Sequence, residues 1–248
     1  MRTFKFLGFI VALAAMGLIC FSCGNGNSSS ITKNESVGKA GNEQVEEIPN
    51  HEYVDLGLPS GTLWATCNVG ADSPEGYGSY FAWGETSTKN TYEWSNYHWG
   101  NDDGKLTKYC DDKFWGVNDF IDTRTVLEAN DDAATVNWGK KWRMPTDAEM
   151  KELIDECSNK WTEQNGIKGL LVTGPNGNSI FLPAAGCVLG NEHFSEGYCG
   201  EYWTSSMISG APYSAYVHRV YQEGFDMDEG YVDDNTREQG LTVRPVYY

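Results

Sequence analysis

Residues 86–115 carry the side chains of this sequence that are best suited to binding chemistry. Aromatic rings alternate there with amides and carboxylates, as in Trp94, Asn96, Tyr97, Trp99, Asn101, Asp102 and Trp115. An exposed aromatic ring can stack on the apolar face of a sugar, while amides and carboxylates bind sugar hydroxyls. We therefore predict a carbohydrate-binding site in this stretch. The alternative is that these rings fill the core of a loop-rich domain, which needs large apolar side chains.

Patterns that accompany catalysis are missing from the sequence. The histidines are His51, His98, His193 and His218, and no two of them have the spacing of zinc ligands. No pair of carboxylates stands out as a general acid and base. Nothing points to a Ser-His-Asp triad, although its members need no fixed spacing. We predict no catalytic residues and expect that the protein is not an enzyme.

Paired aspartates offer one route to a metal site. The pairs are Asp102 and Asp103, Asp111 and Asp112, and Asp226 and Asp228. Each could supply the hard oxygen ligands that Ca²⁺ prefers. The competing interpretation is that these pairs belong to solvated acidic turns. We expect no cofactor, with calcium as the alternative, and the sequence leaves the metal ligands unknown.

Cysteines C-terminal to residue 50 are odd in number. They are Cys67, Cys110, Cys157, Cys187 and Cys199. At least one thiol must therefore stay free or pair between chains. Cys187 and Cys199 are close in sequence and form the first candidate disulfide in an exported protein. The alternative is that all of them are buried as small hydrophobic residues.

The chain begins with the features of an export signal. Arg2 and Lys5 precede an apolar run over residues 6–19. This run is shorter than the roughly 20 residues that a membrane-spanning helix needs. We therefore expect export to the cell envelope rather than a spanning helix.

Cys23 is the expected site of lipidation. It follows Ser22 and precedes Gly24, which resembles the bacterial lipobox, although Cys20 stands where that motif prefers Leu. We expect residues 1–22 to be removed as a signal peptide and Cys23 to anchor the chain in a membrane through lipid. The alternative is an ordinary signal peptide followed by a chance cysteine.

The rest of the chain divides into a linker and a head. Residues 23–50 are polar and lack aromatic rings, so they predict a flexible linker. Residues 51–248, called the head below, have the size of a single domain and contain all nine tryptophans. The net charge of −17 argues against nucleic acid as a partner, because such proteins present a basic face.

Alternating apolar and polar residues predict several short strands in the head. Segments 53–58 and 63–69 flank a Leu-Pro-Ser-Gly-Thr turn and predict a β-hairpin. Further strands are expected at 169–174 and 178–184, joined by a Gly-Pro-Asn-Gly-Asn turn, and at 197–206, 214–221, 225–227 and 241–248.

Two helices are expected between these groups of strands. Asp131 is the expected cap of a short helix over residues 133–138. Thr146 and Glu149 form a capping box at the start of a second helix. Its apolar stripe consists of Met150, Leu153, Ile154 and Cys157. Arg143, just before this helix, is expected to have a structural role by pairing with a buried carboxylate or with carbonyls.

Several sequence blocks resemble a known family. "YVDLGLPSGTLWATCNVGA", "DDAATVNWGKKWRMPTDAEMKELI", "GPNGNSIFLPAAG", "YWTSS" and "LTVRPV" look like the Fibrobacter succinogenes major paralogous domain of Bacteroidetes lipoproteins. More distantly, "WRMPTDAEM", "EYWTSS" and "LTVRPV" resemble the formylglycine-generating family. The resemblance spans nearly the whole head.

The resemblance implies an α+β, C-type-lectin-like fold. Such a fold has small twisted antiparallel sheets, one or two helices, long loops and paired N- and C-terminal strands. It also implies an outer-membrane lipoprotein that binds a glycan or a surface protein, on the surface or the periplasmic side. The alternatives are a structural or adhesin-associated component, and an enzyme of the formylglycine-generating type. The late cysteine pair of that enzyme family has no counterpart, since residues 201–248 contain no cysteine.

Overall fold

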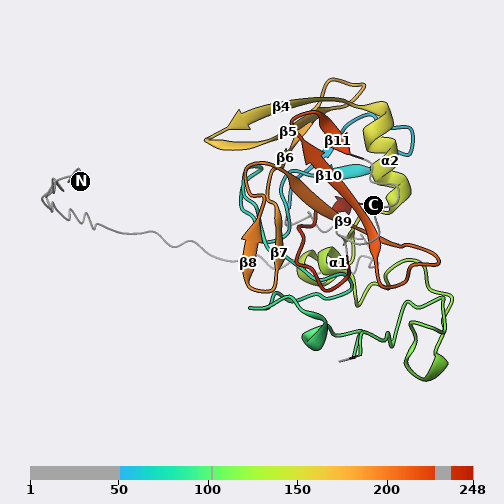
Figure 1. The fold of residues 1–248 in the computed structure, drawn as a ribbon. Helices are drawn as coiled ribbons and strands as arrows, with labels where there is room; N and C mark the ends of the chain where they lie inside the picture. The colour runs from blue at the N-terminus through green and yellow to red at the C-terminus, as the bar shows by residue number, and fades with distance from the viewer. Residues whose placement is uncertain (1–50, 102, 227–235, 248) are drawn as a thin grey trace, which may run out of the picture. The chain divides into compact units, whose positions relative to one another are not determined.

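The computed structural model describes residues 51–101, 103–226 and 236–247. The expected signal peptide, Cys23, the linker, Asp102 and Asp228 therefore lie outside the described residues. Within the described part, short antiparallel strands dominate over two α-helices, which agrees with the α+β class (Figure 1). The helices are α1 (Ala133–Trp138) and α2 (Asp147–Glu156), with 3-10 turns η1 (Trp94–Asn96) and η2 (Val117–Asp119).

Four small sheets are formed by the described strands. The strands are β1 (Tyr53–Asp55), β2 (Leu63–Ala65), β3 (Trp142–Arg143), β4 (Ser158–Gln164), β5 (Ile167–Thr173), β6 (Ser179–Pro183), β7 (Cys187–Leu189), β8 (Glu192–Phe194), β9 (Gly200–Met207), β10 (Ala215–Tyr221), β11 (Gly224–Asp226) and β12 (Val246–Tyr247). Their orders are β1–β2–β12–β3, β11–β10–β9, β4–β5–β6 and β7–β8.

Both ends of the head meet in the first of these sheets. β12 pairs antiparallel with β2, with Val246 opposite Trp64, and β1 lies on the other edge of β2. The expected direct pairing of the first and last strands is therefore wrong in detail. Trp64 is fully buried, so β2 takes the central position and largely exposed β1 takes the edge. The ends stay close, since the rings of Tyr53 and Tyr247 stack with centroids 4.8 Å apart.

The predicted strands of the C-terminal half are largely confirmed. β5 and β6 form the predicted pair, with Leu170 opposite Leu182, and β9 pairs with β10. β4 adds a third strand beside β5. The hairpin of β7 and β8 was not predicted. The expected strand over 241–248 is regular only in β12, because Pro245 has no N–H to donate, and Leu241 and Thr242 form isolated bridges instead.

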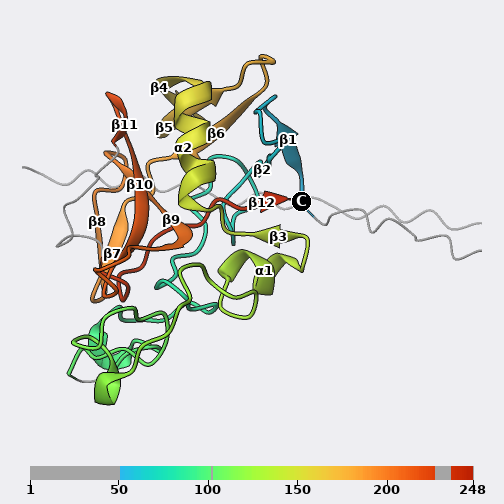
Figure 2. The same ribbon diagram turned by 90° about the vertical axis from the view of Figure 1, so that its right-hand side faces the viewer.

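The aromatic segment 86–115 packs around a small core of its own. This core consists of Ala82, Tyr92, Tyr97, Leu106, Cys110 and Val188, with Tyr80, Trp94, Trp99, Trp115 and Phe120 packed against it. In both views the segment, drawn in green, lies at the opposite end of the head from β4, β5 and β6 (Figures 1 and 2). Long loops thus carry one end of the head and regular sheet the other.

α2 begins as the sequence predicts. The Glu149 N–H donates to the Thr146 hydroxyl at 3.3 Å, and the Thr146 N–H donates to the Glu149 carboxylate at 2.8 Å. Met150 and Leu153 on its apolar stripe are fully buried, and the helix packs against β9 and β10 (Figure 2).

The cap of α1 differs from the prediction. Asp132, not Asp131, accepts a hydrogen bond from the Thr135 N–H at 2.9 Å, and it also accepts from the Met144 N–H at 2.9 Å. The carboxylate of Asp131 is engaged elsewhere, because it accepts from Lys108 Nζ at 2.6 Å. The adjacent aspartate was therefore free to turn towards the helix.

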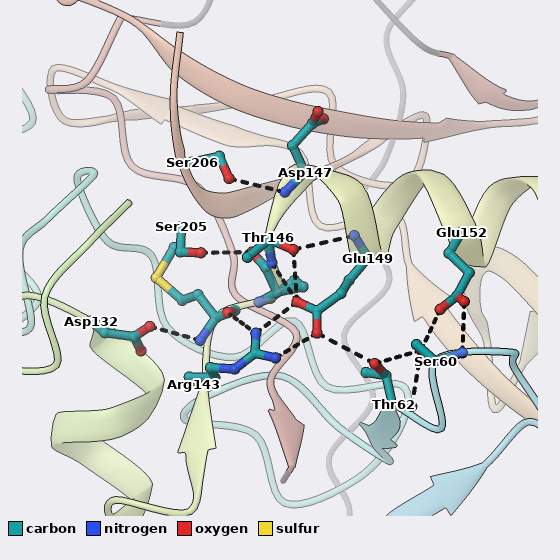
Figure 3. A network of polar contacts seen from close by, with 12 residues as sticks. Ser60, Thr62, Asp132, Arg143, Thr146, Asp147, Glu149, Glu152, Ser205 and Ser206 are labelled. Atoms are coloured by element: carbon teal, nitrogen blue, oxygen red, sulfur yellow. Dashed lines mark hydrogen bonds and ion pairs between the residues drawn. The ribbon is translucent and has the colours of Figure 1, made fainter. Parts of the chain in front are cut away.

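The expected structural role of Arg143 is confirmed. Its guanidinium donates to both oxygens of Glu149, at 2.7 and 2.5 Å, and Glu149 also accepts from the Thr62 hydroxyl at 3.3 Å (Figure 3). The next turn of the helix is held in the same way, since the Ser60 N–H donates to Glu152 at 2.8 Å. These bonds connect the start of α2 to β3 and to the turn between β1 and β2.

Glu149→Gln should lower the unfolding free energy at pH 7 by about 1–3 kcal/mol, the contribution of a hydrogen bond to a charged group. Burial alone would raise the pKa of Glu149, but hydrogen bonds from Arg143 and Thr146 outweigh it and place the pKa below its usual value. A lowered carboxylate pKa stabilises the fold above the unfolded-state pKa of about 4.3, and this stability is lost as the pH falls further. Urea titrations at several pH values between neutral and acidic measure how the unfolding free energy changes with pH.

As the pH falls into the acidic range, the unfolding free energy of the Glu149→Gln variant should therefore decrease less than that of the parent chain. Glu156→Gln is the matched control, because Glu156 is exposed on the same helix and its substitution should change stability by less than about 0.5 kcal/mol. Parallel pH curves for Glu149→Gln and the parent would contradict the assignment of the acid-sensitive carboxylate.

Candidate functional site

The predicted aromatic residues do not form a continuous exposed row. Tyr97 is only 3 % exposed, and its hydroxyl donates to the Trp83 carbonyl at 2.7 Å. It is a core residue, contrary to the prediction, because the loop segment needs a large ring at its centre. Trp94 and Trp115 are half-buried and pack against the same core. Trp99, in contrast, lines a pocket.

Asn101 shapes a turn. Its side-chain oxygen accepts hydrogen bonds from the backbone N–H groups of Asp103 at 3.1 Å and Lys105 at 2.8 Å. Neither Asn101 nor Trp115 lines the pocket beside Trp99. Of the predicted residues that the structure describes, Trp99 and Asn96 therefore come together, while Trp94, Tyr97, Asn101 and Trp115 serve packing and turns. Asp102 lies outside the described residues.

The pocket beside Trp99 is open, polar and about 380 Å³ in volume. We call it the Trp99 pocket. Its lining consists of Gly84, Glu85, Thr86, Ser87, Thr88, Lys89, Asn96, His98, Trp99, Asn130 and Asp131. One indole is thus surrounded by hydroxyl, amide and charged groups, which could orient a ligand through hydrogen bonds.

The indole of Trp99 is held in place from several sides. Its Nε1–H donates to the Gly84 carbonyl at 2.7 Å. The Lys108 ammonium lies 4.8 Å from the ring centre, and the His98 ring packs edge-on with centroids 4.3 Å apart. Since the ring is fixed before a ligand arrives, binding would cost little side-chain ordering.

The carboxylates that line the pocket already have lysine partners. Glu85 accepts from Lys89 Nζ at 2.9 Å and from the His98 N–H at 2.7 Å. Asp131 accepts from Lys108 Nζ at 2.6 Å and from the Tyr109 hydroxyl at 2.5 Å. Burial, together with the hydrogen bond to Asp131, raises the pKa of Tyr109, so it stays a neutral donor. The lining therefore suits an uncharged ligand better than an ionic one.

Other polar groups of the pocket are unused. The side chains of Thr86, Ser87, Thr88 and Asn130 make no hydrogen bond with the residues that the structure describes. Ser87, Thr88 and Asn130 are exposed and Thr86 is half-exposed. These side chains can donate hydrogen bonds to the hydroxyl groups of a ligand, and accept hydrogen bonds from them, without breaking bonds inside the protein.

A second pocket lies against the same segment. It has a volume of about 470 Å³ and is called the Trp138 pocket here. Its lining consists of His51, Val69, Gly70, Ser79, Phe81, Thr86, Ser87, Thr88, Asn137 and Trp138. Residues 86–88 thus line both pockets.

The structure gathers serine, histidine and aspartate side chains at the start of α2. His218 Nε2 lies 3.0 Å from Asp147 Oδ1, and the Asp147 N–H donates to the Ser206 hydroxyl at 3.1 Å. However, His218 Nδ1 is buried without a hydrogen-bond partner among the described residues. The contact between base and nucleophile that such chemistry requires is therefore not formed.

Cys187 and Cys199 are both free thiols, so the predicted disulfide is not formed in the structure. Both are buried, and burial, followed by the charge of Glu201, raises the pKa of each to about 12. The other cysteines of the head are also buried and have free thiols. They fill space as small hydrophobic residues, which was the alternative interpretation.

The described residues contain no group of three or more His, Cys, Asp or Glu arranged to hold a metal ion. Asp111 accepts from the Ser209 hydroxyl at 2.8 Å and from the Gly210 N–H at 2.9 Å, so it stabilises a loop contact. Asp102 and Asp228 lie outside the described residues, and the calcium alternative stays a prediction. In the same part of the chain, no helix combines the length and apolar character needed to cross a bilayer.

Comparisons with protein-family models, with curated proteins and with solved structures find no match to this chain. The geometry of the Trp99 pocket is therefore the basis for assigning a function.

The prediction from sequence missed the hydroxyl wall of the pocket. Thr86, Ser87 and Thr88 follow one another directly after Glu85, and such a run of hydroxyl side chains beside an aromatic-rich segment was a usable signal. Asn130 and Trp138 carried no comparable signal, because only the folded chain brings them close to residues 86–88.

Proposed function

We propose that this protein is a non-catalytic lipoprotein of the cell envelope whose head binds a glycan in the Trp99 pocket. The observation that carries the proposal is a fixed indole beside four side chains with unused hydrogen-bonding groups. Sugars offer both an apolar ring face and many hydroxyls, so this combination complements them. Internal pairing of the charged lining favours a ligand without charge.

The proposal includes a C-type-lectin-like arrangement of the head. Support comes from the pairing of β12 with β2, which joins the two ends of the head, and from the loop-rich segment beside a body of small sheets. Under this proposal the sheets and α2 act as a rigid support, and the long segment 86–115 provides the binding surface.

The proposed anchor rests on the sequence alone. A basic start, an apolar run, Cys23 in a lipobox-like context and a polar linker together favour a head tethered to the outer membrane by lipid. The flexible linker would let the head reach ligands away from the membrane.

A structural or adhesin-associated component is the second candidate. The burial of Tyr97 and the packing of Trp94 and Trp115 favour it, because these rings act in the core of the loop segment. The two functions differ in one measurable property, which is glycan affinity that depends on the Trp99 pocket.

Trp99→Ala should lower glycan affinity about tenfold or more, since the loss of an aromatic platform removes at least about 1.4 kcal/mol. The assay is a glycan array followed by calorimetry with the strongest neutral ligand. Trp94→Ala is the matched control, because Trp94 is a half-buried tryptophan of the same core that does not line the pocket. Equal affinities of the Trp99 and Trp94 variants would contradict the proposal.

A further inference from the structure

The two pockets share one wall. Thr86, Ser87 and Thr88 line the Trp99 pocket and also the Trp138 pocket. Ser87 and Thr88 are exposed, so the wall is a low surface ridge rather than a buried partition. The two hollows are therefore adjacent, and a ligand longer than one of them could continue across residues 86–88 into the other.

The second pocket also has an aromatic surface that is held in place. The rings of Trp138 and His51 stack with centroids 3.7 Å apart and planes 10° from parallel, and Trp138 packs edge-on against Trp142 at 5.0 Å. Burial lowers the pKa of His51, so the imidazole is neutral at physiological pH. Each pocket thus offers one indole that neighbouring rings hold in place.

A hydrogen bond connects α1 to the wall that the two pockets share. Asn137, next to Trp138 in α1, donates from Nδ2 to the Thr86 carbonyl at 3.0 Å and to the Ala133 carbonyl at 2.7 Å. The end of α1 is therefore tied to the shared wall. The wall also connects to the first pocket, because it follows Glu85 directly in the sequence. Glu85 lines that pocket and accepts a hydrogen bond from the His98 N–H.

We infer that the two pockets are subsites of one groove that binds an uncharged oligosaccharide across residues 86–88. This inference rests on the proposed function and extends it to a ligand length and a ligand class. An uncharged ligand fits because Glu85, Lys89 and Asp131 of the first subsite already form ion pairs, and because the net charge of −17 would repel acidic sugars. A chain of several sugars fits because the two hollows, of about 380 and 470 Å³, share residues 86–88 as a wall.

The test uses the full-length protein and an array of neutral glycans with matched disaccharide and hexasaccharide members, together with acidic hexasaccharides. The parent chain should bind the best neutral hexasaccharide about tenfold or more tightly than its disaccharide, because a second aromatic platform is engaged. Trp138→Ala should remove this gain, so that hexasaccharide affinity falls to the level of the disaccharide. Trp99→Ala should weaken binding of both lengths.

Two further variants provide an independent test of the second subsite and a control. His51→Ala removes the stacked partner without removing an indole, and it should reduce the length-dependent gain even if Trp138→Ala fails to fold. Val136→Ala is the control, because Val136 is exposed on the same helix and lines neither pocket. It should keep the parent's affinities for both lengths.

The outcomes separate the inference from the proposed function. Equal affinities for short and long glycans would overturn the two-subsite groove. The same would follow if both Trp138→Ala and His51→Ala kept the full gain in affinity for the longer glycan. In either case, binding that depends on Trp99 would still support the proposed function. Tighter binding of acidic hexasaccharides would overturn the uncharged class. Binding of no glycan would overturn both the groove and the proposed function.

Discussion

Arg244→Leu should lower the unfolding free energy by about 3–5 kcal/mol, because three buried acceptors and one half-buried acceptor would lose a charged donor at about 1 kcal/mol or more each. Arg244 is fully buried, and its hydrogen-bond partners among the described residues are neutral. Its guanidinium donates to the Asn68 side chain at 2.9 Å, to the Phe181 carbonyl at 2.9 Å, and to the carbonyls of Ala65 and Thr66 at 3.2 and 3.3 Å. One side chain thus connects β6, the end of β2 and the final segment.

Replacement of a buried ion pair by apolar residues can stabilise a protein, but that argument does not apply to Arg244. Three of its four partners are backbone carbonyls, which remain in place and unsatisfied in any variant. Arg244→Lys should rescue little, since a single ammonium cannot reproduce the planar fork of donors. Denaturant titrations followed by tryptophan fluorescence measure the loss.

Arg124→Leu serves as the control for Arg244→Leu. Arg124 is exposed and pairs with Asp122 and Glu128, so its loss should cost far less than the loss of the buried Arg244. Losses of similar size in the two variants would refute the role assigned to the buried guanidinium.

Gly186→Ala should lower the unfolding free energy by about 2–5 kcal/mol, from left-handed backbone strain of about 1–2 kcal/mol and overpacking of about 1–3 kcal/mol. Gly186 has a φ of +63°, and a Cβ placed there would lie 1.9 Å from the Phe194 carbonyl oxygen. That oxygen belongs to β8 and cannot move without displacing the β7–β8 hairpin. In addition, the Gly186 N–H donates to the Cys199 carbonyl at 2.7 Å, which limits movement on the other side.

Gly177→Ala separates the two contributions. Gly177 has a φ of +86°, but a Cβ there would meet no atom within 4 Å. Only the backbone strain should remain, at about 1–2 kcal/mol. Both variants are compared by chemical denaturation, and equal losses for Gly186→Ala and Gly177→Ala would remove the close approach to Phe194 from the explanation.

The parts of the fold that depend on local chemistry could be predicted from the sequence. The start of α2 follows from Pro145, Thr146 and Glu149, whose effects act within one helical turn. The turn between β5 and β6 follows from its own glycines and asparagines in the same way. These features require no knowledge of which distant segments meet.

Features that depend on distant contacts were predicted less well. Asp131 and Asp132 are both plausible caps by type, and the choice is made by Lys108, more than twenty residues away in the sequence. Likewise, β12 pairs with β2 rather than β1 because burial of Trp64 places β2 at the centre of the sheet. Such choices are made by packing.

The candidate site shows the same division. Composition identified the aromatic segment, but it could not tell that Tyr97 belongs to the core and Trp99 to a pocket. This difference depends on which face of the loop covers Trp83 and which faces outwards. The contributions of Asn130 and Trp138 depend on the position of α1 beside residues 86–88, which no short-range pattern encodes.

A crystal structure of the protein with a bound neutral oligosaccharide tests the central claim most directly. We predict a sugar ring against the indole of Trp99, with its hydroxyls within hydrogen-bonding distance of the side chains of Thr86, Ser87 or Thr88. Density for the sugar at another surface, for example beside the exposed ring of Tyr198, with none in the Trp99 pocket, would contradict the account.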